Sequence, residues 1–153
     1  MSKLLFFFLL FYLHVANVYS DIIKPNTKIE PYNVVEIQLI SLKNNDKPDK
    51  DFGIEQTWEF AHPENKMNTG PLNNFKKMLK NEIYSILLNH KDHKIEEIYN
   101  NKKIAIYDVI ILGSDNFYYE FKWQVERYDG KGSLNNCWLT TAVSNPVSLG
   151  ASI

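Results

Sequence analysis

The chain has 153 residues, which is enough for one domain with a substantial hydrophobic core. Its 17 basic and 18 acidic side chains give a net charge of −1. Because nucleic-acid binding depends on a surplus of basic side chains, we expect no nucleic-acid partner. Cys137 is the single cysteine, so no disulfide forms within the chain and stability depends on packing.

Residues 1–20 have the pattern of a signal peptide. A basic start precedes an apolar run over Leu4–Leu13, and Val18 and Ser20 are small enough for a cleavage site before Asp21. Polar residues interrupt the apolar run before it reaches the roughly 20 residues of a membrane span. We therefore expect cleavage and no stable membrane span afterwards, with an uncleaved anchor as the alternative. The destination would be the secretory pathway or the extracellular space, or else a plastid reached through that route.

The domain begins at Pro31 with a predicted helix, after a linker over residues 21–30. Val35, Leu39 and Leu42 share one face of this helix at spacings of four and three. Pro31 suits the first turn, where its missing N–H costs nothing. We expect this helix to be largely covered by the rest of the domain.

Two further helices follow. The second is short, spans residues 54–61 with Trp58 on its apolar face, and is stopped by Pro63. The third begins near Pro71 and continues at helical spacing. Its opposite face carries three lysines that we expect to be solvated, namely Lys76, Lys77 and Lys80.

Beyond His93 the hydrophobic period changes from about 3.6 residues to 2, which indicates strands. Strands are predicted over residues 94–99, 103–112, 117–128 and 137–143. The third alternates cleanly, and its apolar face holds Phe117, Tyr119, Phe121, Trp123 and Val125.

Helices first and an antiparallel meander after them predict an α+β domain over residues 31–144. About three helices would cover one face of a curved sheet of about four strands. Residues 145–153 are predicted to form a flexible tail.

Several short motifs occur in one order between residues 34 and 143. They are Ile37-Gln38-Leu39, Gly53-Ile54-Glu55 with Trp58, Thr69-Gly70-Pro71-Leu72 with Phe75, Tyr84 with Leu87-Leu88 and His90, and Cys137-Trp138. In this order they resemble the DUF4864 family of the NTF2-like superfamily. The resemblance implies a cone in which helices close over the concave face of the sheet, and it implies no activity, cofactor or catalytic residue.

In such a cone the gap between helices and sheet is the default ligand pocket. We expect its lining to include Trp58, Tyr84, His90, Tyr119 and Trp123, with an ordinary filled aromatic core as the alternative. The end of a helical turn would let His90 bond a carbonyl and would favour its protonated form.

Other residues that could bind a metal or take part in catalysis are harder to assign to a site. His90 and His93 lack a clear third and fourth ligand, so we expect no metal and no cofactor. Asp108 would be a candidate acid inside the cone, but the strand around it is apolar on both faces and its direction stays open. Cys137 is expected to be a small buried hydrophobe.

We therefore expect a binding module for a small apolar ligand or a protein partner, without catalysis. A lyase or isomerase acting inside the cone is the alternative, and it needs an acid or base in the pocket. A homodimer through the open sheet face is a further possibility, with Tyr118, Gln124 and Tyr128 as contacts. A roomy cone lined by Trp58, Tyr84 and Trp123 without a titrating group would favour the ligand carrier.

Overall fold

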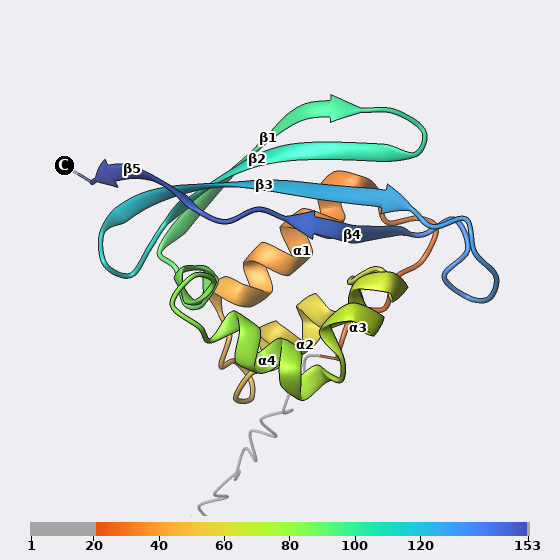
Figure 1. Cartoon of the computed structure of the whole chain (residues 1–153), viewed down its shortest axis with the longest axis horizontal. Coiled ribbons are helices and arrows are strands. Elements are labelled where there is room, and N and C mark those ends of the chain that lie inside the picture. The colour runs from red at the N-terminus through yellow and green to blue at the C-terminus, as the bar shows by residue number, and fades with distance from the viewer. Residues whose placement is uncertain (1–20, 153) are drawn as a thin grey trace, which may run out of the picture.

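Helices precede an antiparallel sheet along the chain, as Figure 1 shows. The computed structural model describes residues 21–152, so the predicted signal peptide over 1–20 lies outside the described residues. The helices are α1 (Pro31–Lys43), α2 (Phe52–Glu59), α3 (Pro63–Thr69), α4 (Leu72–Leu79) and the 3₁₀ helix η1 (Ser85–Leu87). The strands are β1 (Asp92–Asn100), β2 (Ile104–Leu112), β3 (Phe117–Arg127), β4 (Trp138–Val143) and β5 (Val147–Ala151). The predicted α+β class and the switch from helix to strand near His93 are confirmed.

The sheet is open and antiparallel, with the order β1-β2-β3-β4. Strand β5 pairs with the first part of β3, and β4 pairs with its second part, so both lie on the edge of β3 that β2 leaves free. A flexible tail was predicted over residues 145–153, but Val147–Ala151 within it form the strand β5. Its backbone completes the hydrogen bonding of β3, which outweighs the weak strand signal of a short segment next to Pro146.

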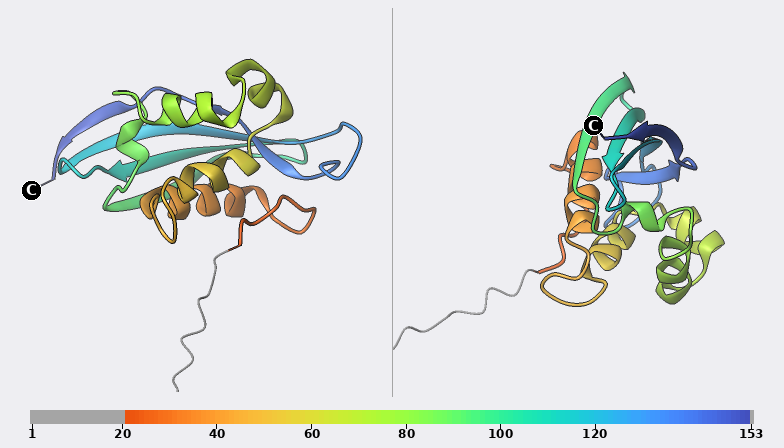
Figure 2. Two further views of the ribbon diagram at one scale, coloured as in Figure 1. Left: turned by 90° about the horizontal axis from the view of Figure 1, so that it is seen from below. Right: turned by 90° about the vertical axis from the view of Figure 1, so that its left-hand side faces the viewer.

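The helices gather on one side of the sheet and leave its other side uncovered (Figures 1 and 2). We call the covered side the inner face and the uncovered side the outer face. On the inner face, Phe121, Trp123 and Val125 of β3 are fully buried, as the alternation predicted. Phe117 was predicted to share this face but is 43% exposed, because the first residues of β3 are not covered.

The first helix lies against the sheet through the predicted stripe, and Val35, Leu39 and Leu42 are all fully buried. Gly53 lets α2 cross α1 closely. A Cβ atom at this position would lie 2.1 Å from the carbonyl oxygen of Ser41, so any larger residue would push the two helices apart. The close crossing brings α2 beneath the sheet and directs Trp58 toward β4 and α4.

Helix α3 was not predicted, because Pro63 was interpreted only as the stop of α2. Helix α2 does end at Glu59, but Pro63 also begins α3, where a missing N–H costs nothing. The Nδ1 atom of His62 caps α3 by accepting the N–H of Glu64 at 3.2 Å. Four α-helices rather than about three therefore cover the sheet of the described chain. No helix among residues 21–152 is long and apolar enough to cross a membrane.

Candidate functional site

An apolar cavity of about 270 Å³ lies between the inner face of the sheet and the helices. Strands β3 and β4 line it from one side, and residues of α1 to α4 line it from the other. Four aromatic rings contribute to its walls: Trp58, Phe75, Tyr84 and Trp123. The core of the described domain is therefore not completely filled, and the cavity lies where the sequence predicted a pocket.

Three of the five predicted pocket residues line this cavity, namely Trp58, Tyr84 and Trp123. The ring of Trp58 packs against Phe75 of α4 with 5.0 Å between centroids. The Tyr84 hydroxyl lies 3.4 Å from the carbonyl oxygen of Val143, at the edge of β4. Trp123 is fully buried on β3. Residues 65 positions apart in the sequence thus meet around one space.

A buried hydrogen-bond network closes the sheet side of the cavity. The Oε1 atom of Gln38 accepts from the Trp123 indole N–H at 3.1 Å and from the Thr140 hydroxyl at 2.6 Å. The Nε2 atom of Gln38 donates to the Thr57 carbonyl oxygen at 3.0 Å. Gln38 therefore fixes the indole of Trp123 and joins α1, α2, β3 and β4 in one place.

The remaining polar groups near the cavity are also engaged with the protein. Asn65 of α3 donates from Nδ2 to the carbonyl oxygens of Thr140 and Thr141, at 3.1 and 2.7 Å. Thr57 donates its hydroxyl proton to the Gly53 carbonyl oxygen at 2.8 Å. Among the described residues, no buried side-chain nitrogen or oxygen lacks a hydrogen-bond partner. The cavity therefore offers few unsatisfied polar groups to a ligand.

The lining contains no Asp, Glu, His, Lys or Cys residue within the described part of the chain. Lys66 lies beside one lining residue, with its Nζ 5.4 Å from the centroid of the Trp58 ring. Burial lowers the pKa of the Lys66 ammonium, and its Nζ donates to the Glu59 carbonyl oxygen at 3.3 Å. Lys66 is not among the residues that line the cavity.

Tyr119 was predicted to line the pocket, but the structure places it elsewhere. Its hydroxyl donates to Asp115 in the β2–β3 hairpin loop at 2.6 Å. This hydrogen bond is the main reason that the pKa of Asp115 is lowered and the pKa of Tyr119 is raised. Tyr119 has the predicted parity on β3, but it lies near the N-terminal end of the strand, beyond the cavity.

His90 also lies outside the cavity. Its Nδ1 lies 2.7 Å from the Leu87 carbonyl oxygen, which confirms the predicted structural hydrogen bond. The predicted preference for the protonated form was wrong, because burial lowers the pKa of His90 to about 4. A neutral ring that donates from Nδ1 accepts at Nε2 from Nδ1 of His93, 2.8 Å away.

The other chemical candidates do not reach the cavity. Asp108 points to the outer face, where it forms an ion pair with Lys122. Cys137 is buried, as predicted, and burial raises the pKa of its thiol. Among residues 21–152, no group of three or more His, Cys, Asp or Glu side chains is placed to hold a metal ion.

A second cleft of about 360 Å³ lies at the other end of the sheet. Its border is mostly polar and includes Glu30, Asn101, Arg127 and Trp138. Asn101 is occupied by its own turn, since Oδ1 accepts the N–H groups of Lys103 and Ile104. Although this cleft is the larger space, its walls are more polar than those of the inner cavity, so the inner cavity is the better candidate site.

Sequence reasoning missed Gln38, Asn65, Phe75 and Thr140 as site residues. One available signal was the position of Gln38 within the buried stripe of α1, between Val35 and Leu42. A polar side chain at such a position needs a buried hydrogen-bond partner. Asn65 and Thr140 gave no such signal, because their roles depend on the contact between α3 and β4.

No family model matches the chain, and no curated protein or solved structure shows significant similarity to it. The resemblance to the DUF4864 family and the NTF2-like superfamily therefore stays a prediction.

Proposed function

We propose that this protein is a non-catalytic binding module that holds a small, neutral, apolar ligand between its helices and its sheet. The observation that carries the proposal is the chemistry of the cavity lining. Trp58, Tyr84 and Trp123 contribute to its walls, and no carboxylate, imidazole, ammonium or thiol of the described chain lines it. We further propose an NTF2-like domain that acts in or beyond the secretory pathway.

The size and polarity of the cavity narrow the ligand class. A dry engineered cavity of about 150 Å³ binds benzene, so a space of 270 Å³ suits a ligand with two or three rings or a branched chain. The amides of Gln38 and Asn65 already bond the protein. A ligand with several hydrogen-bonding groups would therefore lose solvation without gaining partners.

The alternative of a lyase or isomerase is less well supported. Such an enzyme needs a general acid or base within hydrogen-bond reach of its substrate. The two sequence candidates are held elsewhere, Asp108 by Lys122 on the outer face and His90 by Leu87 and His93. Tyr84 is the only lining residue with an ionisable side chain in the described chain.

A fluorescence titration of the full-length protein with N-phenyl-1-naphthylamine tests the proposal. This probe is neutral, has three aromatic rings in two groups, and becomes bright when it leaves water. We expect saturable binding at one site. Because the Tyr84 ring lines the cavity, Tyr84→Ala should weaken binding by roughly three- to tenfold through lost apolar contact.

The matched control is Tyr118→Ala, which removes an exposed tyrosine from the outer face. It should leave the affinity for the probe unchanged. Equal weakening by both variants, or no saturable binding by the unmodified chain, would refute the proposed site. If the probe binds as expected, native mass spectrometry of the protein from its own cells would identify the natural ligand by its retained mass.

A further inference from the structure

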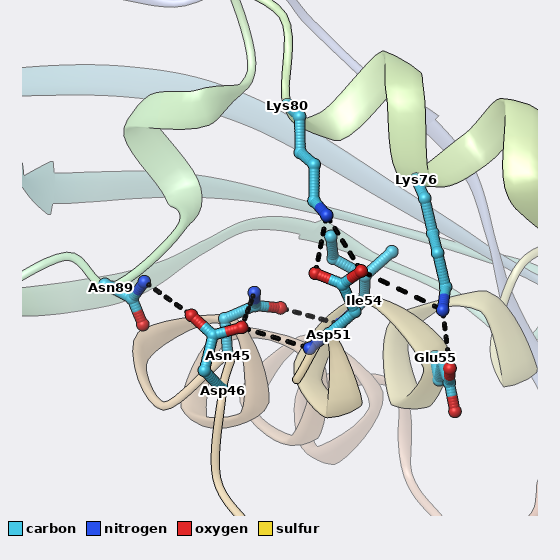
Figure 3. Close-up of polar contacts among 8 residues, drawn as sticks. All are labelled: Asn45, Asp46, Asp51, Ile54, Glu55, Lys76, Lys80 and Asn89. Carbon is cyan, nitrogen blue, oxygen red and sulfur yellow. Dashed lines mark hydrogen bonds and ion pairs between the residues drawn. The ribbon is translucent and has the colours of Figure 1, made fainter. Parts of the chain in front are cut away.

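Lys76 of α4 and Lys80, the residue that follows α4, form ion pairs with acids at the start of α2 (Figure 3). The Nζ atom of Lys80 lies 2.7 Å from Oδ1 of Asp51 and 2.8 Å from its Oδ2. The Nζ atom of Lys76 lies 2.6 Å from Oε1 of Glu55 and 3.9 Å from Oδ2 of Asp51. The solvated lysine face predicted for this helix was therefore wrong for Lys76, which is only partly exposed, whereas Lys80 is exposed and also pairs with Asp51. Lys77 is exposed and forms no ion pair among the described residues.

Asp51, the partner of Lys80, ends a loop that is held by several hydrogen bonds, whereas Glu55 lies within α2. The N–H of Asp51 donates to Oδ1 of Asp46 at 3.0 Å, and Asn45 and Asn89 donate to the same carboxylate. These hydrogen bonds lower the pKa of Asp46. Asn45 in turn accepts the N–H of Ile54 at 3.1 Å. The backbone of Asp51 is left-handed, with φ of 65°, and the loop holds its carboxylate facing α4.

The segment that carries the lysines is attached more loosely. Helix α3 has no buried residue, and α4 buries only Phe75 and Leu79. The start of the segment is fixed to β4, where the N–H of His62 donates to the Thr140 carbonyl oxygen at 2.9 Å. An element with few buried side chains opens locally at low cost.

The same segment covers the cavity. Asn65 and Thr69 of α3 and Phe75, Met78 and Leu79 of α4 all contribute to the cavity lining. The two lysines lie on the side of α4 that faces α2, so their ion pairs hold the cover against the opposite wall of the cavity. Displacing α4 from α2 would break these ion pairs and uncover the apolar space.

We propose that α3 and α4, over residues 63–80, form a lid on the cavity, and that Lys76 and Lys80 hold it closed against Glu55 and Asp51. This inference rests on the proposed ligand-binding function. A ligand enters and leaves while the ion pairs are open, so they control the rates of exchange. The affinity changes little, because the ion pairs form in the closed lid with or without ligand.

Stopped-flow mixing of the full-length protein with N-phenyl-1-naphthylamine tests the lid. The double variant K76Q/K80Q should raise both the association and the dissociation rate by roughly five- to tenfold, with the affinity within about twofold of the original. Salt should accelerate exchange in the unmodified chain by screening the ion pairs, and should have little effect in the double variant. The matched control K77Q removes one charge from the same helix and should change neither rate.

Hydrogen exchange of the ligand-free protein separates failure of the lid from failure of the binding function. In K76Q/K80Q the amides of residues 63–80 should exchange faster, while those of β2 and β3 stay protected. This result supports the lid even if the probe does not bind. Exchange that matches that of K77Q would overturn the proposal, because the two lysines would then not stabilise the lid. Exchange that rises equally across the whole sheet would overturn it too, because the lysines would then stabilise the entire fold.

Discussion

The two faces of the sheet carry similar aliphatic side chains along β2 but bury them to different extents. On the inner face, Tyr107, Val109 and Ile111 are fully buried under the helices. On the outer face, Ile106 and Ile110 remain partly exposed on either side of Asp108. An apolar strand thus does not define its own buried face; the helices that cover it do.

The polar groups of the two faces also differ in kind. On the inner face, Gln38 and Thr140 are neutral and satisfy one another around Trp123. On the outer face, Asp108 and Lys122 are charged and share their ion pair with water. Neutral hydrogen bonds suit a space that must remain apolar, whereas charges keep an uncovered sheet soluble.

The largest expected difference between the faces comes from neighbouring residues of β3. Phe121→Ala should lower the free energy of unfolding by about 3–5 kcal/mol, because it leaves a cavity beneath a fully buried ring. Lys122→Ala should cost less than about 1 kcal/mol, because the Lys122 side chain is exposed. Urea denaturation of both variants measures the two values. Similar costs would mean that the faces are not distinct.

The next largest effect is a pH dependence of the free energy of unfolding, caused by the buried His90. The pKa of His90 is lowered to about 4 in the folded protein, so the unfolded chain takes up a proton first as the pH falls. Stability is then complete above about pH 7 and decreases by roughly 3 kcal/mol between about pH 6.5 and pH 4. His93, whose pKa burial also lowers, acts in the same direction.

The variant His90→Gln should flatten this decrease, because an amide can still bond Leu87 and His93 without taking up a proton. His62→Gln is the control and should keep the slope of the unmodified chain. Denaturant titrations at a series of pH values measure both. An unchanged slope in His90→Gln would place the titrating group elsewhere.

The smallest expected effect belongs to the outer face. Ile110→Thr should change the free energy of unfolding by less than about 1 kcal/mol, whereas Ile111→Thr should cost more by placing a hydroxyl in the core. Sedimentation of the unmodified chain and of Ile110→Thr also tests the predicted homodimer. A mass that rises with concentration and falls in the variant supports that interface; a constant monomer mass contradicts it.

How well the sequence predicts the buried residues of a strand differs between β3 and β2, for physical reasons. The alternation of β3 identified Phe121, Trp123 and Val125 correctly, because polar residues mark the opposite face. The direction of Asp108 on β2 stayed open, because both of its faces are apolar. Tyr119 had the correct parity, but no local pattern shows how far along a strand a cavity extends.

The sequence alone determined the order of helix and strand, the buried stripe of α1 and three of the four aromatic residues that meet at the cavity. These follow from the spacing of apolar side chains, which is a local property of the chain. Only the tertiary structure decided that Gln38 holds Trp123, that Lys76 and Lys80 pair with acids of another helix, and that β5 completes the sheet. Each of these depends on a partner that is distant in sequence, and the residues on one side of a hydrogen bond or ion pair do not identify the partner on the other side.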